Sequence, residues 1–159
     1  MTSRLLFSLI FAAALGSGLA AGLFFAFSSF VMNALGRLPS QQGIAAMQSI
    51  NITVLNPLFS LVFFGTASLC AGFIITSFFR WDQPGMGYLL AGSLIYLIGS
   101  FLVTIVFNVP LNDALALVEP GSAEGANLWT RYLTVWTTWN HIRTAASLVA
   151  LALFIYALR

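Results

Sequence analysis

The chain contains no lysine, a single histidine and a single cysteine, and only 6% of its 159 residues are charged. A soluble domain carries about 25% charged residues, so this chain has too little charge to cover a soluble surface. Six arginines and four acidic residues give a net charge of +2, without the clustered basic stripe that nucleic-acid binding requires. The scarcity of charge therefore excludes a soluble domain and a nucleic-acid partner.

Cys70 and His141 are the only residues of their types, and this limits the available metal chemistry. A lone cysteine cannot form an intrachain disulfide or a cysteine metal site, so we expect Cys70 to be a small buried residue. One histidine, one cysteine and scattered acids cannot build a usual transition-metal shell, and one histidine cannot build a bis-histidine haem site. The sequence therefore predicts no metal site.

The hydrophobic residues, 60% of the chain, fall into four runs that are long enough to cross a bilayer. The first run follows Arg4 as in a secretory signal, but it is too long for a signal core, and we expect an uncleaved span. We place the spans at about 5–32, 57–79, 86–107 and 136–158. The chain is thus predicted to be one membrane domain, 1–159, of the all-α class, folded as an integral membrane four-helix bundle.

The segments between the runs predict how the helices are joined. Residues 41–55 have amphipathic spacing and form a short lead-in to the second span, where Pro57 either kinks one helix or opens a new one. Pro110 is expected to end the third span. The last apolar run, 144–158, measures only about 22 Å as a helix, so residues before it must complete the span and 129–138 should project as a helical extension.

Polar side chains gather at the end of the bundle that lies opposite both termini, because antiparallel spans bring distant segments together there. Side chains of this kind at membrane depth tend to face the interior or a water-filled cavity, so we expect a polar pocket. The residues concerned are Asn51, Asn56, Asn108, Asn112, Asn140, His141 and Arg143. The termini are predicted to be cytoplasmic, by a margin of one arginine.

The run Trp-Thr-Thr-Trp-Asn-His-Ile-Arg, from 136 to 143, contains three of these polar residues. Helical spacing places them on two different faces. Trp136, Asn140 and Arg143 share one helical face, whereas His141 is rotated by about 100° from Asn140. The tryptophans and asparagines of this cluster also have structural interpretations, which the sequence leaves open. Trp136 and Trp139 are also typical of an aromatic belt, and the asparagines are equally suited to satisfying backbone groups freed by prolines.

Several motifs together resemble one protein family. They are Phe24-Phe-Ala-Phe-Ser-Ser-Phe-Val-Met with Leu38-Pro, Met47-Gln-Ser-Ile-Asn, Asn56-Pro, Asn108-Val-Pro-Leu-Asn and the closing Trp136-Thr-Thr-Trp-Asn-His-Ile-Arg-Thr. In this order they are similar to the anthrone-oxygenase-like family of small four-helix integral membrane proteins, over roughly 22–158. The resemblance implies oxidation of polyketide anthrones to anthraquinones with dioxygen, as in the fungal members, without a metal, flavin or other cofactor; most bacterial members are of unknown function.

The resemblance and the residues together suggest an oxygenase site. His141 is the expected base, with Arg143 and Asn140 stabilising negative charge. The expected substrate-binding residues are Trp136, Trp139, Asn51, Asn56, Asn108 and Asn112.

The expected partners are membrane lipid and an apolar small molecule, and small residues such as Gly18 and Gly22 permit a homo-oligomer. The alternative is a non-catalytic membrane protein, a partner subunit or a lipid-binding or small-molecule-binding module with the same polar pocket. A carrier is less favoured because no internal repeat is present.

Overall fold

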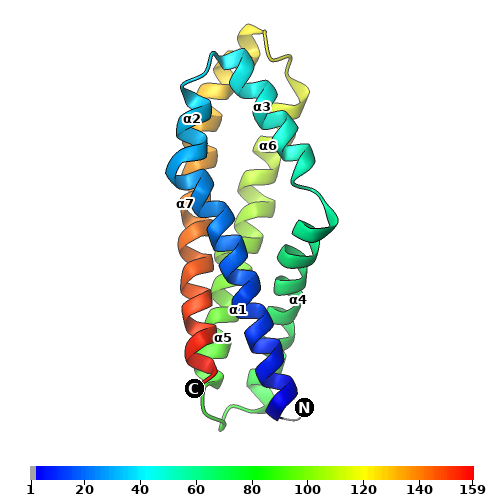
Figure 1. Cartoon of the computed structure of the whole chain (residues 1–159), viewed down its shortest axis with the longest axis vertical. Coiled ribbons are helices and arrows are strands. Elements are labelled where there is room, and N and C mark those ends of the chain that lie inside the picture. Colours follow the sequence, from blue (N-terminus) through cyan, green and yellow to red (C-terminus); the bar gives the residue numbers. More distant parts are fainter. Residues whose placement is uncertain (1–2) are drawn as a thin grey trace.

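The structure, a computed structural model, describes residues 3–159 and contains helices and no strand within that range (Figure 1). Four of its helices are long and apolar enough to cross a membrane: Arg4–Gly36, Pro57–Phe79, Met86–Leu117 and Ala123–Ala157. These findings confirm the all-α class and a chain built as an integral membrane four-helix bundle.

The first long helix contains a widened turn in its last third. Helix α1 (Ser3–Ala26) continues through a π-helical turn (Phe27–Val31) into α2 (Met32–Gly36) without a break in the chain direction. A short turn then leads to α3 (Ser40–Thr53), the amphipathic lead-in that the sequence predicted.

The second long helix, α4 (Pro57–Phe79), begins independently of α3. The side chain of Asn56 caps it by accepting a 3.0 Å hydrogen bond from the Phe59 amide, and Pro57 occupies the first helical position. A proline is well placed there because the amide that it lacks would have no partner inside the helix. Of the two alternatives for Pro57, the structure has the one in which it opens a new helix.

The third long helix passes through Pro110, and the prediction that this proline ends the helix is wrong. Helix α5 (Met86–Tyr96) is followed by two π-helical turns (Leu97–Leu102 and Thr104–Asn108) and then by α6 (Val109–Leu117). Pro110 lies in the first turn of α6, directly after the second π-helical turn. The missing amide and the ring are tolerated in a first turn, because the regular hydrogen-bond ladder restarts there.

The last helix, α7 (Ala123–Ala157), is a single element of 35 residues, or about 52 Å. Its start is fixed by Ser122, whose side-chain oxygen accepts a 2.9 Å hydrogen bond from the Gly125 amide. A hydrocarbon layer of about 30 Å covers little more than half of this length. The predicted helical extension before the last span is therefore confirmed, and it is longer than 129–138.

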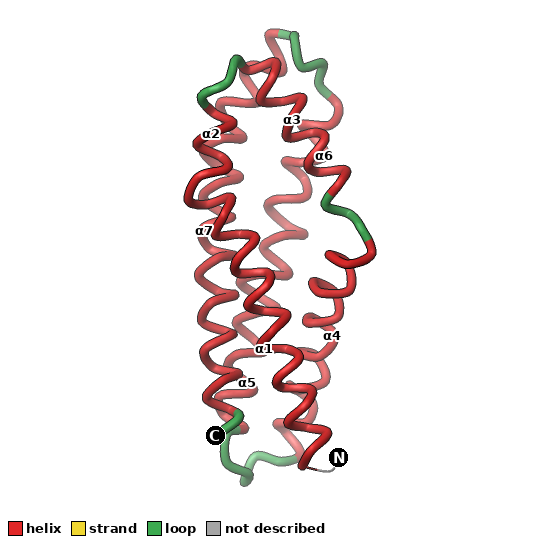
Figure 2. Tube along the Cα trace, in the orientation of Figure 1, coloured by secondary structure: helices red, strands yellow, loops and turns green. Residues whose placement is uncertain are grey.

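The four long helices lie side by side along one axis (Figure 1). The N-terminal end, the C-terminus and the turn between α4 and α5 lie at one end of the bundle, and α3 crosses the other end (Figure 2). Helix α7 packs against both α1 and α5. Gly18 of the predicted small-residue pair contacts Leu151 of α7, whereas Gly22 has open space around it, so the two glycines do not form one contact surface.

The buried interior has two apolar parts separated by a polar layer. The part near the termini includes Phe63, Tyr96 and Phe154, and it contains Cys70, which is fully buried as predicted. The part beneath α3 includes Met47 and Tyr132. The layer between them is made by buried or half-buried polar side chains of the π-helical turns and of α7, namely Ser28, Ser100, Thr104, Asn108, Asn140, Arg143, Thr144 and Ser147.

Helix α4 has the length expected of a helix that just spans the hydrocarbon layer. Its 23 residues measure about 34 Å, close to the thickness of that layer, whereas the other three long helices extend well past its N-terminal end. On each of the other three long helices, an exposed apolar side chain is followed within four residues, toward the α3 end, by an exposed polar one. These pairs are Phe30 and Asn33, Val109 and Asp113, and Ile142 and Thr138. A hydrocarbon layer that α4 just spans would have one edge close to the polar layer.

Candidate functional site

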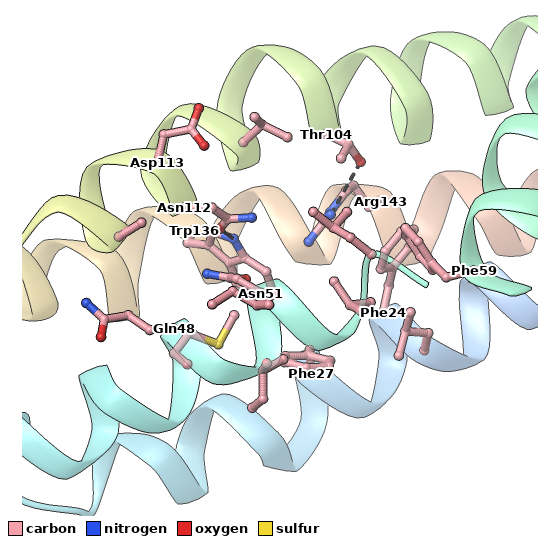
Figure 3. A pocket seen from close by; sticks show the side chains of 18 residues that line it. Phe24, Phe27, Gln48, Asn51, Phe59, Thr104, Asn112, Asp113, Trp136 and Arg143 are labelled. Atoms are coloured by element: carbon pink, nitrogen blue, oxygen red, sulfur yellow. Dashed lines mark hydrogen bonds between the residues drawn. The ribbon is translucent and has the colours of Figure 1, made fainter. Parts of the chain in front are cut away.

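A pocket of about 470 Å³ lies beside the polar layer, between α1, α3, the first turn of α4, α6 and α7 (Figure 3). Most of its wall is apolar or aromatic. The aromatic residues are Phe24, Phe27, Phe59 and Trp136, and the polar ones are Gln48, Asn51, Thr104, Asn112, Asp113 and Arg143. A few polar groups in an apolar cavity of this size are typical of a site for a small organic molecule.

Arg143 reaches the pocket from α7 and is only 4% exposed. Its guanidinium donates to the side-chain oxygens of Asn140, over 2.7 Å, and Thr104, over 3.3 Å. The rings of Phe24 and Trp136 lie 4.3 and 4.9 Å from the guanidinium carbon. Two aromatic rings and two hydrogen bonds thus fix the orientation of the cation.

The charge of Arg143 has no anionic partner within residues 3–159, and its buried Nε has no hydrogen-bond acceptor there. A buried cation is costly unless it is paired, because burial removes its water. An acceptor or anion that enters the pocket would supply the missing interaction.

Asn140 connects the pocket to the packing of α1 on α7. Its amide nitrogen donates to the carbonyl oxygen of Phe24 and to the hydroxyl of Ser28, each over 2.7 Å. Ser28 also lies 3.0 Å from the hydroxyl of Thr144. Every polar atom of the Asn140 side chain therefore has a partner, which makes this residue a positioning group for Arg143.

Asn112 orients the aromatic wall on the α6 side. Its side-chain oxygen accepts hydrogen bonds from the Tyr132 hydroxyl, over 2.7 Å, and from the Trp136 indole, over 2.8 Å. The rings of Tyr132 and Trp136 stack at 5.6 Å. With its oxygen engaged by two donors, Asn112 keeps its amide hydrogens for other acceptors.

Two further asparagines have an unsatisfied buried atom. The amide nitrogen of Asn108 donates to the Trp136 carbonyl over 3.1 Å, while its side-chain oxygen has no partner among residues 3–159. The amide nitrogen of Asn51, which lines the pocket, lacks a partner in the same range. Buried polar atoms are rarely left unpaired, so Asn51 is a second donor available to a ligand.

Each π-helical turn within residues 3–159 contacts α7 along this part of the bundle. The turn Phe27–Val31 carries Ser28, the turn Leu97–Leu102 carries Ser100, and the turn Thr104–Asn108 carries Thr104 and Asn108. π-Helical turns are rare and are often found at functional sites, where they change the direction of side chains. Here they bring polar groups of two helices against Asn140, Arg143 and Ser147.

The structure brings most, but not all, of the predicted site residues together. Asn51, Asn112, Trp136 and Arg143 line the pocket, and Asn108 and Asn140 lie directly behind it. Three predicted residues lie elsewhere. His141 is on the exposed face of α7, Asn56 is the exposed cap of α4, and Trp139 stacks on Phe107 at 3.6 Å, outside the pocket.

Sequence reasoning did not assign Gln48, Thr104 and Asp113 to the site. The clearest signal was Asp113, because it is adjacent to Asn112 in a segment that was already expected to reach the polar end. Gln48 joins α3 to the end of α6 by donating to the carbonyl oxygens of Leu115 and Val118. No local pattern marks that role, because it depends on how two distant helices pack.

Within residues 3–159, no group of three or more histidine, cysteine, aspartate or glutamate side chains is close enough to hold a metal ion. The groups that could interact with a bound molecule are therefore the guanidinium, the amides, the carboxylate of Asp113 and the aromatic rings. They suit a flat apolar molecule that carries an oxygen acceptor or negative charge at one edge.

Comparison with known proteins gives one family match. No curated protein and no solved structure matches the chain. The sequence model of the family described as anthrone oxygenase matches residues 59–153, which is more than half of the chain. The match extends from the first turn of α4 into α7 and includes Asn112, Trp136 and Arg143 of the pocket. The chain therefore belongs to the anthrone oxygenase family.

Proposed function

We propose that this protein is a membrane-embedded oxygenase that oxidises an apolar aromatic substrate of the anthrone type with dioxygen. The observation that carries the proposal is the buried cation of Arg143, which lacks an anion within residues 3–159 and lines a largely aromatic pocket. The family match agrees with this chemistry.

The reaction would begin with loss of a proton from the methylene carbon that lies opposite the carbonyl group of the substrate. The resulting carbanion is delocalised onto the carbonyl oxygen, which becomes a phenolate-like anion. Arg143 and the free amide of Asn51 are the donors that would stabilise this oxygen. Phe24, Phe27 and Trp136 would stack against the flat rings.

Dioxygen would then complete the oxidation without a bound redox group. It adds to the carbanion to form a C–O bond, and protonation of the distal oxygen gives a hydroperoxide. Loss of the remaining hydrogen at that carbon as a proton, with cleavage of the O–O bond, forms the carbonyl group and releases water. The carbon loses four electrons and dioxygen accepts four, so one dioxygen gives one quinone and one water.

Asp113 is the base that we assign to the first step, in place of His141. Asp113 is the carboxylate among the lining residues and is exposed at the rim, so it can pass the proton to water. His141 is exposed on another face of α7 and does not line the pocket. A general base must come within hydrogen-bond reach of the proton that it removes, directly or through one water.

The test is oxygen consumption by purified protein in detergent with anthrone, followed together with formation of anthraquinone by absorbance. The expected result is consumption of equal amounts of dioxygen and anthrone, above the spontaneous rate, which disappears in Arg143→Met. A parent protein that binds anthrone without accelerating oxygen uptake would overturn the catalytic proposal and support the binding-module alternative.

A further inference from the structure

The wall of the pocket is interrupted where α3 ends and α4 begins. Residues 54–56 form a non-helical link, so the two helices do not close this side of the bundle. The side chains of Ile52 and Leu55, at 76% and 71% exposure, line the pocket at this break. Val109 and Asp113 of α6, also exposed, line it on the other side. The pocket therefore has a mouth between the link and α6.

A hydrocarbon layer that α4 just spans would end at this mouth. Phe59 lines the pocket from the first turn of α4, the helix whose length matches that layer. The two sides of the mouth differ, because Ile52 and Leu55 are both apolar whereas the α6 side combines the apolar Val109 with the charged Asp113. Apart from Ile52, the exposed residues of α3 are mostly polar. They are Gln41, Gln42, Ala45, Ser49 and Thr53. The apolar side suits lipid and the charged side suits water.

We propose that the pocket takes its ligand sideways from the bilayer, through the break between α3 and α4, and not from the aqueous phase. The ligand class is a flat, lipid-soluble molecule with an acidic hydroxyl or a carbonyl oxygen. Its apolar body crosses the lip made by Ile52 and Leu55, and its oxygen meets the unpartnered donors of Arg143 and Asn51. Asp113 keeps the opposite side of the mouth in contact with water. This inference uses the proposed function only for the choice of probe.

The first test obstructs the lip and measures binding kinetics. Leu55→Trp and Leu61→Trp are a matched pair, because both leucines are 71% exposed and only Leu55 lines the pocket. The variants are placed in lipid nanodiscs and mixed with 1-hydroxyanthraquinone, which has the required shape but no methylene group to oxidise. Its absorbance and fluorescence report binding in a stopped-flow instrument.

We expect Leu55→Trp to slow association and dissociation alike, each by about tenfold, with little change in Kd, because a gate alters the path and not the end states. Leu61→Trp should behave as the parent protein. Equal rates in all three proteins would overturn entry at this lip. Failure of the parent to bind the probe would overturn the proposed ligand class.

The second test locates the lip without using any ligand. A nitroxide is attached to Leu55→Cys in a Cys70→Ala background, and its collisions with dioxygen, which concentrates in lipid, and with a water-soluble nickel chelate are compared by electron paramagnetic resonance. Labels at Leu61→Cys and Gln42→Cys serve as lipid and water references, since both positions are exposed. The label at position 55 should match the lipid reference. A match to the water reference would overturn the lateral route.

The two proposals fail in different ways. Loss of oxygenase activity in the parent protein, with slowed binding in Leu55→Trp and a lipid-exposed label, would remove the catalytic proposal and leave the entry route intact. An active parent protein, with unchanged binding rates in Leu55→Trp and a water-exposed label at position 55, would remove the entry route and leave the catalytic proposal intact.

Discussion

The guanidinium of Arg143 donates a 2.7 Å hydrogen bond to the side-chain oxygen of Asn140, one helical turn away on the same face of α7. The amide nitrogen of Asn140 is in turn committed to Phe24 and Ser28 of the neighbouring helix. The group that orients the cation is therefore also a link between two spans. Substitutions of Arg143 should therefore mainly affect activity, whereas substitution of Asn140 should also affect stability.

Arg143→Met should abolish oxygenation while leaving the fold intact. The substitution removes a buried charge that has no ion pair within residues 3–159, and this gain offsets the loss of the hydrogen bonds to Asn140 and Thr104, so the stability should change little. Loss of the oxyanion donor should lower kcat by about 100-fold to 1,000-fold. Oxygen uptake and the Tm in detergent are the two measurements. A large fall in Tm would show that the cation is structural.

Arg143→Lys is the companion variant because it keeps the charge but loses the planar fork of donors. A lysine cannot reproduce the simultaneous contacts to Asn140 and Thr104 between two aromatic rings. We expect only partial activity. Full activity in the lysine variant would show that a point charge is sufficient.

Asn140→Ala should destabilise the bundle. It leaves the Phe24 carbonyl, the Ser28 hydroxyl and one arm of Arg143 without their partner, at a cost of roughly 2–4 kcal/mol for buried groups. Equilibrium unfolding in detergent measures the effect. Asn127→Ala is the control, because Asn127 is exposed on the same helix and its removal should change stability by less than about 0.5 kcal/mol.

Asp113→Asn and His141→Ala distinguish the two candidate bases. Removal of a general base costs about 100-fold or more in kcat, so Asp113→Asn should lose most activity with little change in KM. His141→Ala should remain active because His141 lies outside the pocket. The opposite outcome would return the role of base to the histidine that the sequence suggested.

Gly16→Ala and Gly22→Ala test the packing of α1 in a matched pair. A methyl group at Gly16 would collide with the hydroxyl of Thr66 on α4, whereas Gly22 has no neighbour within 4 Å of the same position. We expect Gly16→Ala to lower the free energy of unfolding by about 1–3 kcal/mol through overpacking. Gly22→Ala should unfold like the parent protein. Similar changes in the free energy of unfolding at both sites would mean that helix propensity, and not contact with α4, causes the change.

The fold was largely predictable because bilayer thickness and helical rise are fixed lengths. Four apolar runs imply four spans, and the short run after Thr144 implies that α7 starts much earlier. Pro110 was misjudged because a proline ends a helix only where the regular ladder of hydrogen bonds would otherwise continue. The preceding π-helical turn already interrupts that ladder, and no residue pattern announces such a turn.

The site was predictable where one helix determines it. The spacing of Trp136, Asn140 and Arg143 places them on one face, and the same spacing separates His141, which the structure places on an exposed face. The contributions of Asp113 and Gln48 depend on the rotation of α6 and α3 about their own axes. Those rotations are set by packing over the whole helix, so the local sequence did not show them.

The π-helical turns also have a consequence for how chain length varies among related sequences. Each such turn holds one residue more than an α-helical turn while the flanking segments keep their faces. Deletion of one residue within Phe27–Val31 would therefore leave α1 and α2 in register with α7, whereas the same deletion elsewhere in α1 would rotate everything beyond it by about 100°. Single-residue gaps in alignments of the family should accordingly fall at these turns, and chains that carry the gap should lack the placement of Ser28 against Asn140.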